Sequence, residues 1–179
     1  MEKWKLLSKN VIYDNWYVKM ERWNMQVSTN KEKEFSVTTM PDASIVFALT
    51  EDNEIIILEQ YFLTDQEKHL SLVAGFVEDT ESPEETARKE LREESGCEAK
   101  KWISLGSVKR GKWTIGEMHF FLALGVKEVG DLQLEESEFI KPRKISLKDF
   151  LSYLENDKIQ AVDAQLCAYK ALHYLKKLS

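Results

Sequence analysis

Cysteine, glycine and proline are all scarce in this chain of 179 residues. It contains 2 Cys, 7 Gly and 3 Pro, so chain breakers are few and we expect mostly tight connections. Cys97 and Cys167 have neither the paired spacing of a metal site nor the number needed for a disulfide framework. We therefore expect Cys97 to pack beneath a helix end rather than to react.

Long apolar runs are also missing. No segment approaches the ~20 apolar residues of a membrane-spanning helix. The start, Met1-Glu2-Lys3-Trp4-Lys5, lacks the apolar stretch of a signal peptide. We expect a cytoplasmic protein with no membrane partner.

The chain also lacks an excess of positive charge. The net charge is -6, which argues against a long nucleic-acid partner, because such proteins carry a basic patch. An anionic substrate stays compatible with this charge, since a bound metal ion reverses the local field. Hydrophobic residues make up 43% and charged residues 31%, which is typical of a soluble globular domain with a real core.

The apolar pattern alternates between strands and helices. Residues 3–40 are rich in aromatic and β-branched residues and indicate several short strands. Residues 43–49 and 54–62 are two apolar runs around a polar turn, which favours a central hairpin buried on both faces. Further strands are predicted at 69–74, 102–108, 118–124 and 139–145, and helices at 148–155 and 162–178. The last helix shows an apolar spacing of Leu166, Tyr169, Leu172 and Leu175. Strands mixed with helices in this order predict an α/β fold with helices on the faces of a mixed sheet.

The segment from Gly75 to Cys97 carries the chemistry. Glu93 and Glu94 follow Glu90 by three and four positions, so both lie close to Glu90 on one helix. Carboxylate oxygens are the ligands that hard divalent cations prefer. A solvated acidic face is the ordinary interpretation of such a helix, but it does not account for the glycines that open and close the segment.

The ends of this helix are marked by capping residues. Ser82 is a good N-cap, Pro83 suits the first helical position, and Glu85 completes a capping box. Gly96 supplies a left-handed stop. Within the helix, Ala87 and Leu91 are four apart and are predicted to face the core.

The spacing Gly75, Glu81, Lys89-Glu90 and Glu93-Glu94, followed by Gly96, resembles the Nudix box. The resemblance implies a Nudix-like α/β/α sandwich over residues 41–179, with a mixed central sheet. It also implies an N-terminal antiparallel strand extension over residues 1–40 that forms a homodimer. Members of the family cut phosphoanhydride bonds in nucleoside diphosphates linked to another group.

The resemblance also implies a cofactor, Mg²⁺ or Mn²⁺. Its ligands would be Glu90, Glu93 and Glu94, with the backbone carbonyl of Ala74 added as in the ADP-ribose pyrophosphatase branch. Such ions neutralise diphosphate charge and lower the pKa of the attacking water. Glu93 is thus a candidate both as a metal ligand and as a catalytic residue.

A base must still accept or position the proton of the water. The segment 132–140 resembles the branch's acidic loop, in which a glutamate precedes Phe-Ile or Phe-Val. Glu138 is the first candidate and Glu136 the second. An ordinary acidic surface loop is the alternative.

Three positions depart from the ADP-ribose branch. Lys89 replaces an arginine that orients the box glutamates, and lysine keeps the charge without the planar fork. Val73 stands where the branch has proline, and Phe62 stands where it has a phosphate-binding arginine. A related nucleotide sugar is therefore as compatible as ADP-ribose.

Five residues are candidates for substrate contact: Trp16, Trp23, Gln60, Gly75 and Glu117. In the related sub-branches an N-terminal extension stacks on the nucleobase, which is the reason for the two tryptophans. Packing in the core or in a dimer interface is the alternative for either of them.

The main hypothesis is a Mg²⁺-dependent pyrophosphohydrolase that converts ADP-ribose or a nucleotide sugar into a nucleoside monophosphate and a sugar phosphate. The alternative is a Nudix-like sensor that binds a nucleotide without cutting it. Removal of RNA caps is a third and weaker hypothesis, because the chain is acidic.

Overall fold

Two compact units make up the residues described by the computed structural model, 3–134 and 139–177. The first unit comprises the chain up to Asp42 together with Val108–Glu117, and the second comprises Ala43–Ser107 and the chain from Met118. The expected boundary after residue 40 stays a prediction. The segment Val108–Glu117 lies in the first unit although it is far from residues 1–40 in the sequence.

The first unit is a four-stranded sheet in the order β1-β2-β3-β10. Its strands are β1 (Lys5–Asp14), β2 (Lys19–Ser28), β3 (Lys31–Thr39) and β10 (Thr114–Ile115). The turn after β1 forms because the Asn15 side chain accepts hydrogen bonds from the backbone N–H groups of Tyr17 and Val18, at 3.1 and 2.7 Å. β1 and β2 are antiparallel, as are β2 and β3, whereas β10 runs parallel to β3.

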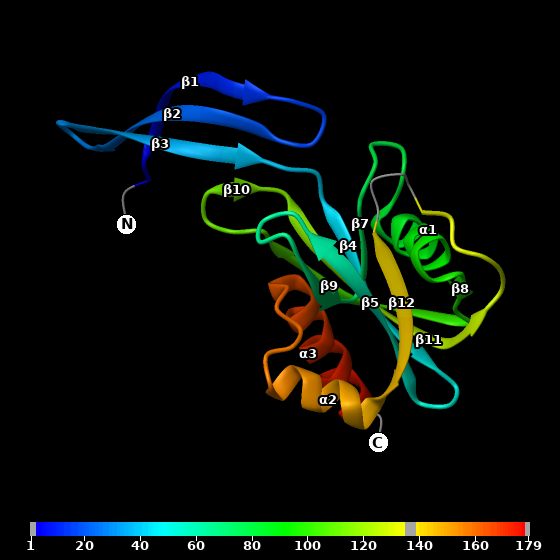
Figure 1. Cartoon of the computed structure of the whole chain (residues 1–179). Coiled ribbons are helices and arrows are strands. Elements are labelled where there is room, and N and C mark those ends of the chain that lie inside the picture. Colours follow the sequence, from blue (N-terminus) through cyan, green and yellow to red (C-terminus); the bar gives the residue numbers. More distant parts are fainter. Residues whose placement is uncertain (1–2, 135–138, 178–179) are drawn as a thin grey trace. The chain divides into compact units, whose positions relative to one another are not determined.

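The second unit is an eight-stranded mixed sheet with three helices (Figure 1). The sheet runs β12-β5-β4-β11-β8, with β6 paired to β5, β7 to β4 and β9 to β11. β4 and β11 are parallel. The pairs β11–β8, β12–β5, β4–β5, β4–β7 and β5–β6 are antiparallel. The elements are β4 (Ala43–Thr50), β5 (Glu54–Phe62), β6 (Glu67–Ser71), β7 (Val73–Phe76), α1 (Pro83–Ser95), β8 (Cys97–Glu98), β9 (Lys101–Lys109), β11 (Glu117–Glu128), β12 (Ile140–Ser146), α2 (Leu147–Glu155) and α3 (Val162–Lys176).

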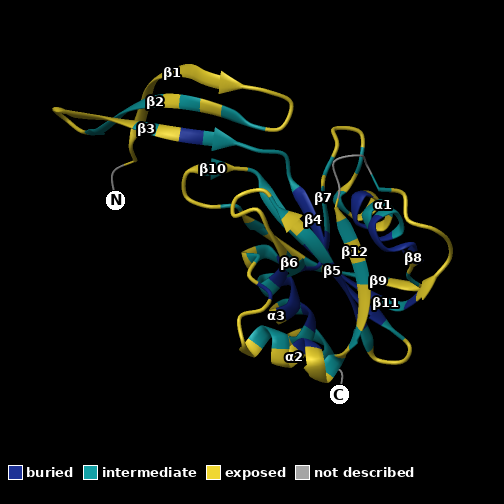
Figure 2. Ribbon diagram, in the orientation of Figure 1, coloured by how far each residue is buried: buried dark blue, intermediate teal, exposed yellow. Residues whose placement is uncertain are grey.

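Helices cover both faces of this sheet, as predicted. On one face, Val46 and Ala48 of β4 belong to the same buried cluster as Ala87 and Leu91 of α1. On the other face, Phe47 packs edge-on against Phe150 of α2, with ring centroids 5.3 Å apart. Because side chains alternate along a strand, a strand covered on both faces is apolar at every position. Figure 2 shows the buried residues concentrated in β4, β5, α1 and α3.

The buried face of α3 differs from the predicted apolar spacing. The residues that pack inward are small, namely Ala164, Cys167, Ala168 and Ala171. Tyr169 is 67% exposed and stacks on His173. Small residues let the helix approach the sheet closely, so the Cys167 Sγ lies 3.5 Å from the carbonyl oxygen of Ile45. Burial raises the pKa of the Cys167 thiol to about 12, so this thiol stays protonated at neutral pH.

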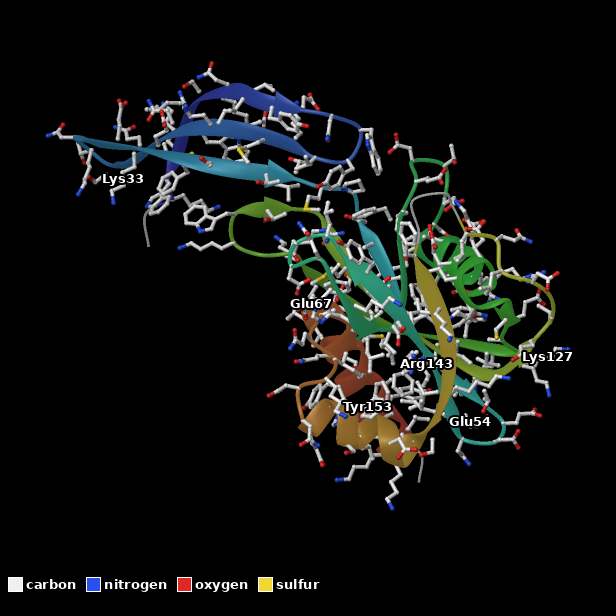
Figure 3. The ribbon with its side chains drawn as sticks, viewed as in Figure 1. Lys33, Glu54, Glu67, Lys127, Arg143 and Tyr153 are labelled. Carbon is white, nitrogen blue, oxygen red and sulfur yellow. The ribbon has the colours of Figure 1, made fainter. Side chains whose placement is uncertain are left out.

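The predicted central hairpin is present but short. β4 and β5 pair only at Ala48–Ile56 and Leu49–Ile55. Beyond these positions β5 pairs with β6 and β12, and Arg143 of β12 forms an ion pair with Glu59 of β5 (Arg143 is labelled in Figure 3). The predicted strand 69–74 is divided into β6 and β7 at Leu72.

None of the helices in the described residues is long and apolar enough to cross a membrane. Both cysteines are buried and unpaired, and Cys97 lies directly after the end of α1, as expected.

Candidate active site

Helix α1 begins and ends at the predicted capping residues. The Ser82 hydroxyl accepts a hydrogen bond from the N–H of Glu85 at 3.3 Å, and the Glu85 carboxylate accepts one from the N–H of Ser82 at 2.8 Å. Pro83 occupies the first turn, and Gly96 ends the helix with φ of +66°. The helix is therefore set locally by four residues that the sequence identifies.

Packing then fixes which way the helix faces. Ala87 and Leu91 are fully buried against the sheet, as predicted. Glu94 is also buried, with 3% of its surface exposed, whereas Glu90 and Glu93 are half-buried. A buried carboxylate requires hydrogen-bond partners or a cation, because desolvating its charge is costly.

Two box glutamates converge on the backbone of β7. The Glu94 carboxylate accepts a hydrogen bond from the N–H of Ala74 at 3.0 Å. Glu90 packs directly against Gly75, since a Cβ placed on Gly75 would lie 2.0 Å from Glu90 Oε1. Gly75 is therefore required by the position of the Glu90 side chain and not by a special backbone angle.

Ion pairs between Lys89 and two glutamates stabilise the loop between β7 and α1. The Lys89 ammonium donates to Glu78 at 2.7 Å and to Glu81 at 3.3 Å, and these bonds raise the pKa of Lys89 above its usual value. The second oxygen of Glu81 accepts a hydrogen bond from the buried Thr86 hydroxyl at 2.8 Å. Glu81 thus links the loop to the helix through both of its carboxylate oxygens. The spacing of the box residues does not predict this hydrogen bond from Thr86.

The donor set at this place fits a hard divalent cation. The carboxylates of Glu90 and Glu94 lie against Gly75 and Ala74 of β7, and carboxylate oxygens are the ligands that such cations prefer. Among residues 3–134 and 139–177, no three His, Cys, Asp or Glu side chains form a metal-holding group. The structure thus gathers Glu90, Glu94 and Ala74 but does not draw Glu93 into a three-carboxylate cluster with them.

The two candidate bases, Glu136 and Glu138, lie outside the described residues. On the preceding side, the N–H of Gln133 donates to the carbonyl of Glu93 at 2.9 Å. On the following side, the carbonyl of Phe139 accepts from the N–H of Tyr61 at 3.3 Å.

The other candidate residues fall in both units. In the second unit, Gln60 pairs with His69 of β6 and with Ile140 of β12. Phe62, where the branch has arginine, packs on the His69 ring with centroids 4.8 Å apart.

The remaining candidates belong to the first unit. Trp16 is 83% exposed, and Trp23 donates from its indole N–H to Glu21 at 3.1 Å while Lys9 lies over its ring. The backbone N–H of Glu117 donates to the Asp42 carboxylate at 2.7 Å. Their roles in substrate contact stay predictions.

A comparison with known families decides the kind of domain. Residues 38–166 match the family model described as the NUDIX domain. The chain belongs to the Nudix family. The resemblance inferred from the Gly75–Cys97 segment is thereby confirmed.

Known relatives of this Nudix chain agree with the assignment. It is 28% identical over 174 residues to ADP-ribose pyrophosphatase of Bacillus subtilis (strain 168), covering 96% of this chain and 92% of the relative. It is 27% identical over 158 residues to the methanol dehydrogenase activator of Bacillus methanolicus, covering 87% and 85% of the two chains. The prediction of a Nudix hydrolase that acts on phosphoanhydride bonds is confirmed.

A solved structure described as an ADP compounds hydrolase has the same fold. The TM-score is 0.88, with 17% sequence identity, and the match covers 100% of this chain and 97% of that one. The predicted Nudix-like α/β architecture is therefore confirmed.

Proposed function

We propose that this Nudix enzyme hydrolyses ADP-ribose or a related nucleoside diphosphate sugar, with Mg²⁺ or Mn²⁺ as cofactor. The observation that carries the proposal is the convergence of Glu90 and Glu94 on the Ala74–Gly75 backbone. The substrate class is supported by the relative named ADP-ribose pyrophosphatase, which aligns with nearly the whole chain.

Glu90, Glu94 and the Ala74 carbonyl would hold the ion, with Glu93 as a further ligand from the same helix. When bound, such an ion neutralises diphosphate charge and lowers the pKa of water. The protein's own part is to keep these oxygens in place. It does so through the burial of Leu91, the close approach at Gly75 and the Lys89 ion pairs.

In the proposed reaction, water attacks one phosphorus of the diphosphate. A new P–O bond forms and the bond from that phosphorus to the bridging oxygen breaks, which releases a nucleoside monophosphate and a sugar phosphate. Glu138, or Glu136 as the second choice, accepts the water proton. Both follow a segment that is hydrogen-bonded to the Glu93 carbonyl.

Substrate selection is proposed to involve Gln60 and Gly75, and Trp16, Trp23 and Glu117 of the first unit. Phe62 packs on His69 and brings no positive charge to the place where the ADP-ribose branch has arginine. A nucleotide sugar is therefore as compatible with this site as ADP-ribose.

A substrate panel tests the proposal. The purified chain is incubated with ADP-ribose, nucleotide sugars, dinucleoside polyphosphates and capped RNA, with Mg²⁺, with Mn²⁺ and with a chelator. Phosphate released after phosphatase treatment is then measured. We expect product from ADP-ribose or a nucleotide sugar only when a divalent ion is present. Tight binding without product on every substrate would favour the nucleotide sensor, and cleavage of capped RNA alone would contradict the substrate class.

We also propose that the enzyme is a homodimer joined through its N-terminal strands. β1 is exposed along its whole length and carries apolar side chains, among them Val11, Ile12 and Tyr13 at 47–56% exposure (Figure 2). Soluble monomers rarely display an apolar surface of this kind or a long free edge strand. A cytoplasmic location stays a prediction.

A further inference from the structure

The C-terminal end of α1 is capped by a distant segment of the chain. The N–H groups of Val129 and Gly130 donate to the Gly96 carbonyl at 2.9 and 3.3 Å, and the N–H of Gln133 donates to the Glu93 carbonyl at 2.9 Å. The last carbonyls of a helix have no partner within the helix. Residues 129–133 therefore supply the hydrogen bonds that the helix end lacks.

Close approach of the two backbones depends on two glycines. A Cβ on Gly96 would lie 2.3 Å from the backbone oxygen of Gly130, which cannot move aside without displacing the segment. Gly96 also has a positive φ of +66°, a conformation that favours glycine. A Cβ on Gly130 would meet the Arg92 guanidinium at 2.6 Å.

Arg92 closes this contact with its side chain. Its Nη1 donates to the carbonyl of Asp131 at 3.2 Å, and its guanidinium lies against Gly130. Arg88, one turn earlier on the same side of the helix, behaves differently. It pairs with Glu84 at 2.7 Å and lies over the Trp102 ring. Arg92 alone of these two arginines contacts the 129–133 segment through a described bond.

We propose that Arg92 is a positioning residue for hydrolysis, an inference that rests on the proposed function. Glu93 and Glu94, beside Arg92 in the helix, belong to the candidate metal site. The segment that Arg92 holds leads in the sequence to the candidate bases Glu136 and Glu138. One contact thus joins the helix that carries the ligands to the chain that carries the base. Misplacing a catalytic group by 1 Å costs about a hundredfold in rate.

Arg92→Ala tests the inference, with Arg92→Lys as the conservative variant and Arg88→Ala as the control on the same helix. Hydrogen exchange at the amides of Val129 and Gln133 reports whether the segment is held. We expect exchange in Arg92→Ala to be about tenfold faster, because local opening becomes easier. We expect kcat on the best panel substrate to fall by about tenfold or more, with KM changed less than about twofold. Arg92→Lys should recover part of both effects, and Arg88→Ala should match the wild type in both.

Each contrary result has a distinct meaning. Unchanged exchange in Arg92→Ala overturns the holding role, whether or not any substrate is cleaved. Faster exchange with wild-type kcat overturns the role in catalysis. Equal losses in Arg92→Ala and Arg88→Ala would mean general damage to the helix and would also overturn the inference. A wild type without product on any substrate overturns the proposed function and the catalytic part of this inference, while the exchange result still decides whether Arg92 holds the segment.

Discussion

Gly75 and Glu90 are the residues at which a change of a few atoms should matter most. A Cβ on Gly75 would lie 2.0, 2.1 and 2.5 Å from Glu90 Oε1, Cδ and Cγ. The whole end of the Glu90 side chain, and not one atom, would have to move. The sequence could predict that a glycine belongs at this place in the box, but only the structure shows that Glu90 is its neighbour.

Gly75→Ala should therefore inactivate the enzyme without unfolding it. We expect kcat to fall by about a hundredfold, since the added methyl group displaces the Glu90 carboxylate, a proposed metal ligand. Gly111→Ala is the matched control, because a Cβ there meets nothing within 4 Å. Steady-state kinetics and thermal unfolding of both variants check this. Similar kinetics for the two alanine variants would show that the Gly75–Glu90 contact does not serve activity.

The residue type at position 89 predicts a charge but not the partners of that charge. The replacement of arginine by lysine predicts the same charge with less rigid geometry. The structure adds the partners, because the single ammonium reaches both Glu78 and Glu81. Glu78 has no fixed place in the spacing of the box, so this second partner could not be predicted from the motif.

At the scale of elements, α1 was predictable because its boundaries depend on neighbouring residues. Ser82, Pro83, Glu85 and Gly96 act within one turn of the chain. The buried face of α3 was not predictable in the same way. Its inward residues are small, and the choice between them and the larger Leu166 and Tyr169 depends on how closely the sheet approaches.

The cap of α1 gives a prediction about stability and pH. Ser82→Ala should lower the free energy of unfolding by about 1 kcal/mol near neutral pH. Hydrogen bonds from the Ser82 side chain and backbone hold the pKa of Glu85 below its ordinary value. A lowered carboxyl pKa stabilises the fold above the unfolded-state pKa of about 4.3, and this contribution is lost as the pH falls through the folded-state pKa.

The difference between wild type and Ser82→Ala should therefore shrink between about pH 7 and about pH 3. Urea unfolding at the two pH values measures it. Ser146→Ala removes the equivalent cap of α2, where Ser146 accepts from the N–H of Asp149 at 3.1 Å, and shows the cost of losing a cap at another helix. A difference that grows on acidification would contradict the assigned role of Glu85.

At the scale of the whole molecule, the long-range pairings limited what the sequence could predict. The alternation of strands and helices predicts a mixed sheet between helices, and the structure has one. The pairing of β4 with β11 joins residues far apart in the chain, as does the contact of Arg92 with Asp131. Neither has a local signal, because each depends on the path of the intervening chain.

The proposed dimer gives the prediction for the assembled molecule. Val11→Glu should convert a dimer into a monomer, because it places a charge in the middle of the exposed apolar strand β1. Val162→Glu is the control, since Val162 is 74% exposed in the first turn of α3, where a glutamate is well tolerated. Light scattering after size-exclusion chromatography measures the mass of each variant. A wild type with the mass of one chain would rule out the dimer.

The turnover of Glu94→Gln on ADP-ribose or the preferred nucleotide sugar tests whether Glu94 holds the metal ion for hydrolysis. The amide oxygen can still accept the hydrogen bond of Ala74, so the fold should be kept, but the charge that would bind the ion is lost. We expect wild-type product only with Mg²⁺ or Mn²⁺, and a loss of about a hundredfold or more in kcat for Glu94→Gln. Glu84→Gln, on the exposed side of the same helix, should keep wild-type activity. A folded Glu94→Gln with wild-type turnover would show that the Glu94 charge is not needed for hydrolysis.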